Sequence, residues 1–189
     1  MTIVLFENPE QVDATLIDRL LPLLPPERQQ RVLRGKFHCV RAQSAIGYLL
    51  LWYALRTDYG IVEAPRLEVG EHGKPYLRDH PAVFFNISHC RAAVACVVSD
   101  RPVGIDVQEL IESPSPALAA KIAEPQPATA FSNWDLTCLW TQKEASAKLH
   151  GDGLSVPLAS LPFADDVIQT VRRETASGQA YALSVAVFS

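Results

Sequence analysis

The most informative stretch of this chain is Trp140-Thr-Gln-Lys143-Glu144-Ala-Ser-Ala-Lys148-Leu-His-Gly151-Asp-Gly153-Leu154. Its spacing predicts the second half of an amphipathic helix, with the two glycines supplying the permissive backbone that ends it. Trp140, Glu144 and Lys148 follow one another at intervals of one helical turn, so the pattern predicts that they share one face. An apolar stripe with one lysine in it runs beside that face: Leu136, Leu139, Trp140, Lys143 and Ala147. Taken alone, Glu144 and Lys148 are better interpreted as a solvated ion pair that adds a few tenths of a kcal/mol.

Composition indicates a globular protein without a membrane span. The 189 residues are 48% hydrophobic and 20% charged, which is enough for one domain or two small lobes. The longest apolar run, Ile46 to Leu55, is too short to cross a bilayer. The first residues carry no basic region and no cleavage motif, so we expect a cytoplasmic protein.

The net charge and the spacing of the cysteines argue against two kinds of function, nucleic-acid binding and zinc binding. A net charge of −4 and a pI near 5.7 argue against nucleic-acid binding. The four cysteines are widely spaced, without a CxxC pair, so we expect buried, reduced thiols and no zinc site. A basic cluster between residues 28 and 41 indicates either a solvated helix face or a site for a phosphorylated ligand or acidic partner. The four cysteines are Cys39, Cys90, Cys96 and Cys138. The basic cluster consists of Arg28, Arg31, Arg34, Lys36 and Arg41.

The order of elements predicts an α+β fold of two similar lobes, each a long helix packed on a small antiparallel sheet. A long helix over 40–56 precedes short strands up to residue 98, and a helix from an N-cap near Asn133 precedes two closing strands up to residue 188. We expect an N-terminal lobe at 1–101, a C-terminal lobe at 102–189 and a hinge near Pro102. The segment 112–127 is expected to form a short, exposed and mobile helix between two proline-rich loops, and residues 70–76 a turn-rich segment.

One of the expected apolar strands contains an acidic residue. Asp106 lies inside the expected strand Val103–Val107, with Gln108 on the same face and Ile105 on the other. A buried charge needs a partner or a metal, although an aspartate that caps a nearby turn is an alternative. Together, Asp106 and Glu144 predict a Mg²⁺ site that faces phosphate groups. The groups expected to bind or neutralise these phosphates are Lys74 in Gly73-Lys-Pro75, Asn86, Ser88 and His89 in Asn86-Ile-Ser-His89, and Lys143 and Lys148.

These motifs, in this order and spacing, resemble the 4′-phosphopantetheinyl transferases, specifically the monomeric, surfactin-synthetase-activating type. The matching elements span residues 28–163: Gly73-Lys-Pro75, Phe85-Asn-Ile-Ser-His89, Val103-Gly-Ile-Asp106, Trp140-Thr-Gln-Lys-Glu-Ala-Ser-Ala-Lys148 and Gly151-Asp-Gly-Leu154. The resemblance implies two similar α+β lobes with the active site in the cleft between them. It also implies transfer of the phosphopantetheine arm of coenzyme A to a serine of an apo carrier protein, with release of adenosine 3′,5′-bisphosphate.

The resemblance also implies roles for individual residues. Asp106 and Glu144 would bind Mg²⁺ together with the coenzyme A pyrophosphate, and Lys148 would stabilise charge on the pyrophosphate as it breaks. Glu144 is a candidate general base, with a metal-bound water as the alternative. The coenzyme's phosphates would be held by Arg41, Lys74, Ser88 and His89, with Lys143 nearby, and its 3′-phosphate by Arg28 and Arg31.

The chain departs from the family pattern at Gln108, where many relatives carry a second acid. Either the Gln108 amide oxygen or a water would then complete the metal shell, and Mn²⁺ is an alternative to Mg²⁺. The segment 110–133 is short, which leaves open the identity of the carrier: fatty acid, polyketide, nonribosomal peptide or another. The use of acyl-coenzyme A is also left open by the sequence. A catalytically inactive coenzyme A or carrier-binding module, or an unrelated Mg²⁺-dependent phosphoryl or nucleotidyl enzyme, are the competing hypotheses.

Overall fold

Small antiparallel sheets and two long helices make up the computed structural model, which describes residues 1–70, 73–151 and 165–189. The first sheet has the strand order β1-β5-β4, from strands Thr2–Glu7, Ala93–Ser99 and Phe84–His89. The second has the order β6-β8-β7, from Val103–Glu109, Ala180–Phe188 and Asp166–Glu174. A two-stranded ribbon pairs β2 (Leu67–Val69) with β3 (Pro75–Leu77). The prediction of an α+β fold with small antiparallel sheets is therefore confirmed.

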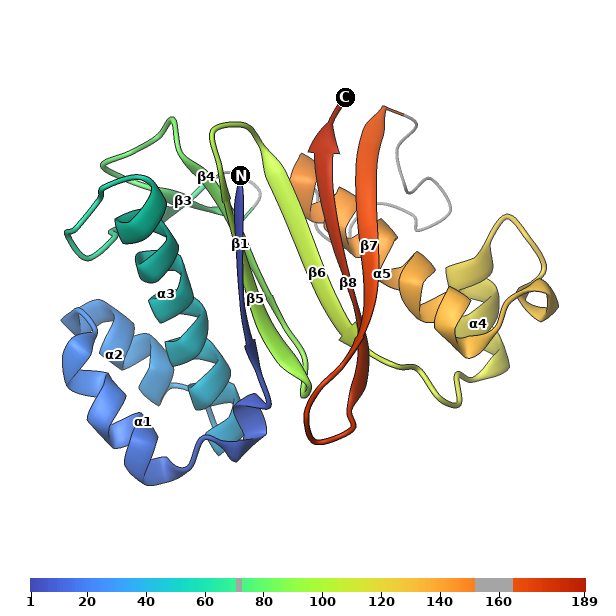
Figure 1. Cartoon of the computed structure of the whole chain (residues 1–189), viewed down its shortest axis with the longest axis horizontal. Coiled ribbons are helices and arrows are strands. Elements are labelled where there is room, and N and C mark those ends of the chain that lie inside the picture. Colours follow the sequence, from blue (N-terminus) through green and yellow to red (C-terminus); the bar gives the residue numbers. More distant parts are fainter. Residues whose placement is uncertain (71–72, 152–164) are drawn as a thin grey trace.

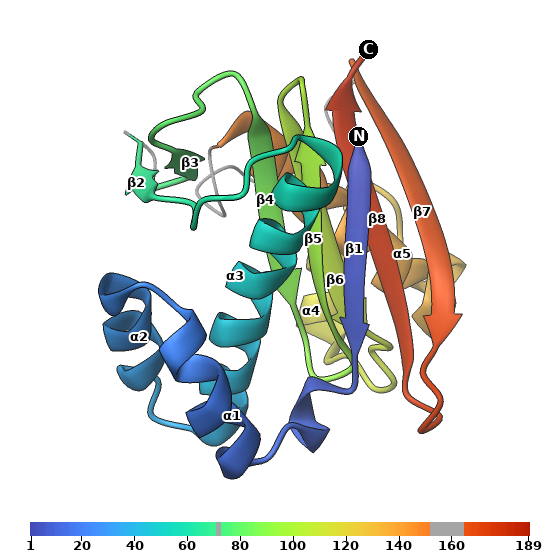
Figure 2. The ribbon, with the colours of Figure 1, turned by 60° about the vertical axis from the view of Figure 1, so that its left-hand side comes forward.

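One long helix covers the outer face of each larger sheet. Helix α3 (His38–Asp58) packs on β5 and β1, and helix α5 (Asn133–His150) packs on β6 and β8 (Figure 1). Helices α1 (Ala14–Leu20) and α2 (Pro26–Leu33) lie on the side of α3 that faces away from the strands (Figure 2). Helix α4 (Pro116–Ala123) packs on α5, and short 3₁₀ turns occupy Pro9–Gln11, Leu21–Leu23 and Ala128–Ala130. No helix in the described parts of the chain combines the length and apolarity needed to cross a membrane.

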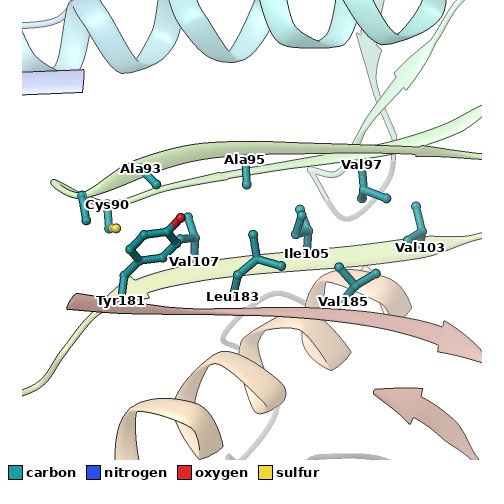
Figure 3. Close-up of a cluster of buried hydrophobic side chains, with 11 residues drawn as sticks. Cys90, Ala93, Ala95, Val97, Val103, Ile105, Val107, Tyr181, Leu183 and Val185 are labelled. Carbon is teal, nitrogen blue, oxygen red and sulfur yellow. The ribbon is translucent and has the colours of Figure 1, made fainter. Parts of the chain in front are cut away.

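The two larger sheets face each other across an apolar layer. Figure 3 shows Ala93, Ala95 and Val97 of β5 pointing toward side chains of β6 and β8. Alternation along β6 explains this arrangement, because Ile105 and Val107 point into the layer while Asp106 points to the other side of the sheet. The predicted alternation of β6 is confirmed, and it directs Asp106 toward α5.

Helix α5 approaches β6 unusually closely at Gly104. A Cβ added to Gly104 would lie 2.0 Å from the carbonyl oxygen of Ala145 and 2.5 Å from the amide nitrogen of Leu149. Only a residue without a side chain allows this contact. The glycine therefore sets the separation between the strand that carries Asp106 and the helix that carries Glu144 and Lys148.

The ends of α5 follow from its sequence, with one correction. Its N-cap is Ser132 rather than Asn133, because Ser132 and Asp135 form a reciprocal capping box. At the other end Gly151 adopts φ = 86°, the left-handed conformation that ends a helix, as predicted. Asp152, Gly153 and Leu154 of the predicted motif lie outside the described residues.

Three further expectations are corrected by the structure. All four cysteines are free thiols, but Cys39 is exposed and Cys138 half-buried, because each lies on a helix face that no other element covers completely. The segment 112–127 is only partly exposed, since α4 buries Ala119 and Ile122 against α5. The turn predicted over 70–76 is present, with the Gly73 N–H donating to the Gly70 carbonyl, but it ends earlier than predicted, because strand β3 begins at Pro75 and pairs with β2.

Candidate active site

Asp106 lies at the centre of a small polar cluster between β4, β6 and α5. Its carboxylate is only 6% exposed. The Oδ1 atom accepts hydrogen bonds from the Lys148 ammonium at 2.6 Å and from the Ser88 hydroxyl at 2.7 Å. Lys148 also donates to the Ser88 Oγ at 3.0 Å, so the three side chains form a closed triangle. The structure thus brings together residues that are 18 and 42 positions from Asp106 in the sequence.

Glu144 lies one turn before Lys148 on α5 and is 9% exposed. Its Oε1 atom is buried and has no hydrogen-bond partner among the described residues. Burial raises the pKa of Glu144 above its ordinary value, the negative charge of Asp106 raises it further, and the Lys148 ammonium partly offsets both effects. Glu144 and Asp106 therefore lie within electrostatic reach of each other.

His89 and Gln108 flank this cluster. His89 is the last residue of β4 and is exposed. Loss of hydration lowers the pKa of His89, the nearby Lys148 ammonium lowers it further, and Asp106 raises it, so the ring lies within electrostatic reach of both groups. Gln108 lies two residues beyond Asp106 on the same face of β6, with its Nε2 donating to the Glu109 carbonyl at 3.3 Å. Its amide oxygen is therefore not engaged by that bond.

Two lysines that were predicted to meet phosphate are bound to main-chain carbonyls instead. Lys143 is 1% exposed, and its ammonium donates to the Ile122 and Glu124 carbonyls at 2.8 and 3.0 Å. Lys74 donates to the carbonyls of Lys148, Leu149 and Val103 at 2.6, 3.1 and 3.3 Å. Both ammonium groups therefore satisfy the free carbonyls at a helix C-terminus, of α4 and α5 respectively. Neither hydrogen-bonds to Asp106 or Glu144 in the described structure.

The predicted phosphate-binding arginines gather around α2 and α3. The Arg28 guanidinium lies 4.9 Å from the centre of the Tyr48 ring and donates to the Ser44 carbonyl at 3.4 Å. Burial lowers the pKa of Arg28, and neighbouring Arg31 adds to this effect. The buried Nε of Arg28 has no partner among the described residues, so this cluster retains a donor for an anion.

Arg41, half-buried on the first turn of α3, donates its Nε to the Gly35 carbonyl at 2.8 Å. The same helix reaches the turn after His89, because Gln43 Nε2 donates to the Cys90 carbonyl at 2.9 Å. Helix α3 therefore links the contacts of Arg28 and Arg41 to the turn that follows His89.

One buried polar cluster was missed from the sequence. The Asp166 carboxylate at the start of β7 accepts hydrogen bonds from Ser146 and from the His150 Nε2, the latter at 3.0 Å. Ser146 and His150 are one helical turn apart on α5. Their spacing is the sequence signal, but their partner could be recognised only from the pairing of α5 with β7.

The donor set at Asp106 suits a hard divalent cation. The described residues contain no group of three or more acidic, histidine or cysteine side chains arranged around a common point. Asp106 and Glu144 offer two carboxylates, of which the buried Glu144 Oε1 lacks any partner. Mg²⁺ characteristically takes one or two carboxylates and completes its shell with phosphate oxygens and water. The residues present therefore fit such an ion.

Comparison with known proteins links this chain to one kind of enzyme. A 4′-phosphopantetheinyl transferase of Bacillus subtilis is 29% identical over 154 residues, which cover 76% of this chain and 67% of that protein. The transferase psf-1 of Bacillus pumilus is 31% identical, over 76% of this chain and 65% of its own length. The transferase gsp of Aneurinibacillus migulanus is 29% identical, over 86% and 71%.

The chain thus aligns with about two thirds of the length of these relatives. No family model matches it. All five curated matches carry the same enzyme name, and they share it with the family that the sequence motifs resemble. The chain is a homologue of the 4′-phosphopantetheinyl transferase enzymes.

Proposed function

We propose that this chain transfers the 4′-phosphopantetheine group of coenzyme A to a serine hydroxyl of an apo carrier protein, with release of adenosine 3′,5′-bisphosphate. The observation that carries the proposal is the buried, unpartnered carboxylate oxygen of Glu144 beside Asp106 and Lys148. A pair of carboxylates with one adjacent ammonium suits charge compensation around a pyrophosphate. The names of the relatives support the same reaction class.

Asp106 and Glu144 would hold Mg²⁺, with Gln108 or a water completing the shell, and Mn²⁺ as an alternative ion. When bound, the ion would neutralise the pyrophosphate and make its phosphorus easier to attack. Residues of the chain would supply the proton acceptor and the stabilisation of the leaving group. Glu144 would accept the proton of the serine hydroxyl, directly or through a water molecule. Lys148, already positioned by Ser88, would stabilise the charge that develops on the departing bisphosphate.

Arg28 and Arg31 would bind the 3′-phosphate, because Arg28 retains an unpartnered donor with Arg31 beside it. Arg41 would contribute to holding the phosphates of the coenzyme. His89 lies within electrostatic reach of Asp106 and Lys148 and suits the pyrophosphate side of coenzyme A. The proposal gives Lys74 and Lys143 no phosphate contact, since their ammonium groups are used by helix-terminal carbonyls.

We further propose that residues 1–101 and 102–189 are two similar lobes, and that the protein acts as a cytoplasmic monomer on its carrier. The placement of one long helix on each larger sheet supports a common lobe design. The acceptor hydroxyl would reach Glu144 where β4 and β6 meet.

A second candidate is a coenzyme A or carrier-binding module that has lost turnover. The amide at Gln108, in place of an acid on the same face as Asp106, is the observation that favours it.

Mass spectrometry separates the two functions. An apo acyl carrier protein and an apo peptidyl carrier domain are each incubated with the protein, coenzyme A and MgCl₂. A mass gain of one phosphopantetheine on the carrier, absent with EDTA and absent for Asp106→Ala, supports the transferase. Binding of coenzyme A by calorimetry with no mass gain on any carrier supports the module and rejects the transferase.

A further inference from the structure

The two larger sheets are joined along β4 and β6 by side chains instead of a main-chain ladder. Strand β4 is an edge of the first sheet and β6 is an edge of the second. The Asn86 Oδ1 on β4 accepts the Ile105 N–H at 3.0 Å, and the Ser88 Oγ accepts the Val107 N–H at 3.2 Å. Two side chains spaced two residues apart on β4 therefore replace the carbonyls that a neighbouring strand would offer.

These two hydrogen bonds bracket Asp106, which lies between Ile105 and Val107 on β6. Ser88 also touches Asp106 and Lys148, so it acts on the site directly. Asn86 differs from Ser88, because in the described structure it accepts a hydrogen bond from the Ile105 N–H and makes none with Asp106 or Lys148. Asn86 is 7% exposed and Ile105 is fully buried, so no water can easily take over this acceptor role.

We propose that Asn86 is a positioning residue that sets the place of Asp106 by holding the Ile105 N–H. The inference rests on the proposed function, for which Asp106 is a metal ligand. If the acceptor at position 86 is lost, a buried N–H is left unsatisfied and β6 shifts relative to β4. Asp106 then moves relative to Ser88 and Lys148, although its own side chain is unchanged.

Serine is the conservative replacement for Asn86. Ser88 reaches the Val107 N–H from the equivalent position on β4, so a serine at position 86 keeps an acceptor on the same edge. Asn86→Ser should therefore retain what Asn86→Ala removes, at nearly the same side-chain volume. Asn133→Ala, which removes an exposed asparagine whose amide donates to the Glu112 carbonyl at 2.5 Å, is the control for a general loss of stability.

The three variants are compared with the wild type below their unfolding temperatures. Measured quantities are kcat, KM for coenzyme A, the half-saturating Mg²⁺ concentration, and hydrogen exchange at the Ile105 amide. Asn86→Ala should lower kcat by about tenfold or more, because displacement of a catalytic group by about 1 Å can cost ~100-fold. It should also raise the half-saturating Mg²⁺ concentration and speed exchange at Ile105. Asn86→Ser should recover most of each change, and Asn133→Ala should show none.

The inference is overturned if Asn86→Ala keeps wild-type kcat and Mg²⁺ dependence, or if Asn86→Ser is as impaired as Asn86→Ala. A failure of the proposed function appears differently, as a wild-type protein that modifies no carrier. Hydrogen exchange still decides in that case. Faster exchange at the Ile105 amide in Asn86→Ala, restored in Asn86→Ser, supports the positioning role, and equal rates in all variants reject it.

Discussion

Gly104→Ala should damage both stability and activity, because the added methyl group meets main-chain atoms that cannot rotate away. Its Cβ would lie 2.0 Å from the Ala145 carbonyl oxygen, whereas such contacts are essentially never closer than 3.0 Å. Helix α5 must therefore move from β6 by about 1 Å at this point. Overpacking of this kind costs about 1–3 kcal/mol, and a main-chain clash belongs at the upper end of that range. For a chain of this size, 3 kcal/mol lowers Tm by roughly 6–12 °C.

The same movement separates the proposed metal ligands. Glu144 precedes Ala145, Lys148 precedes Leu149, and Asp106 lies two residues after Gly104. A displacement of about 1 Å should therefore lower transfer activity by ~100-fold at a temperature where the variant is folded.

Gly70→Ala is the matched control for this substitution. Its added Cβ meets the Lys74 carbonyl oxygen at 3.4 Å, which is an ordinary van der Waals contact. This variant should stay close to the wild type in both measurements. Thermal unfolding followed by circular dichroism and mass-shift kinetics on an apo carrier provide the data. Wild-type Tm and activity for Gly104→Ala would refute the close helix–strand contact.

Three further predictions concern the charged residues of α5 and their partner on β6. Asp106→Ala and Glu144→Ala should each lower carrier modification by more than about 1,000-fold while the far-UV circular dichroism is unchanged, whereas Lys148→Ala should lower kcat by ~100-fold with little change in the KM for coenzyme A. Lys143→Met should leave the Ile122 and Glu124 carbonyls unpaired and lower the free energy of unfolding by about 1–3 kcal/mol, measured by urea titration. Glu144→Gln should raise the Tm of the metal-free protein at neutral pH, because burial and then Asp106 raise the pKa of Glu144 above its ordinary value of 4.5. The ionised carboxylate costs stability above that raised pKa, and the cost disappears as the pH falls toward 4.5, so the Tm difference between variant and wild type should vanish in acid.

The helix and the strand that carry the acids could be predicted from local patterns. Helical spacing places Glu144 and Lys148 on one face of α5, and alternation places Asp106 opposite Ile105 on β6, as the structure confirms. Both patterns report periodicity, which is a property of a single element. They do not report which element lies opposite, and so they could not show that Gly104 is the contact between the two.

The roles of polar side chains on β4 depend on strand order, which periodicity does not contain. Asn86 and Ser88 were predicted to be donors for an anion, since both side chains can donate. In the structure their oxygens accept the N–H groups of Ile105 and Val107. This role exists only because β6 is an edge strand of a different sheet and presents N–H groups without a main-chain partner at that edge.

The placement of Lys74 and Lys143 affects the charge balance of the cluster at which we propose a cation. Had Lys74 and Lys143 pointed their ammonium groups at Asp106 and Glu144 beside Lys148, the cluster would have carried a net positive charge and would have repelled Mg²⁺. Their long side chains instead end on carbonyls of α5 and α4, where the partial negative charge of a helix terminus compensates them. Lys148 then neutralises Asp106, and the Glu144 carboxylate retains an oxygen with no partner in the described structure. Burial, and after it the Asp106 charge, raise the pKa of Glu144, and the divalent ion that we propose would favour the ionised carboxylate.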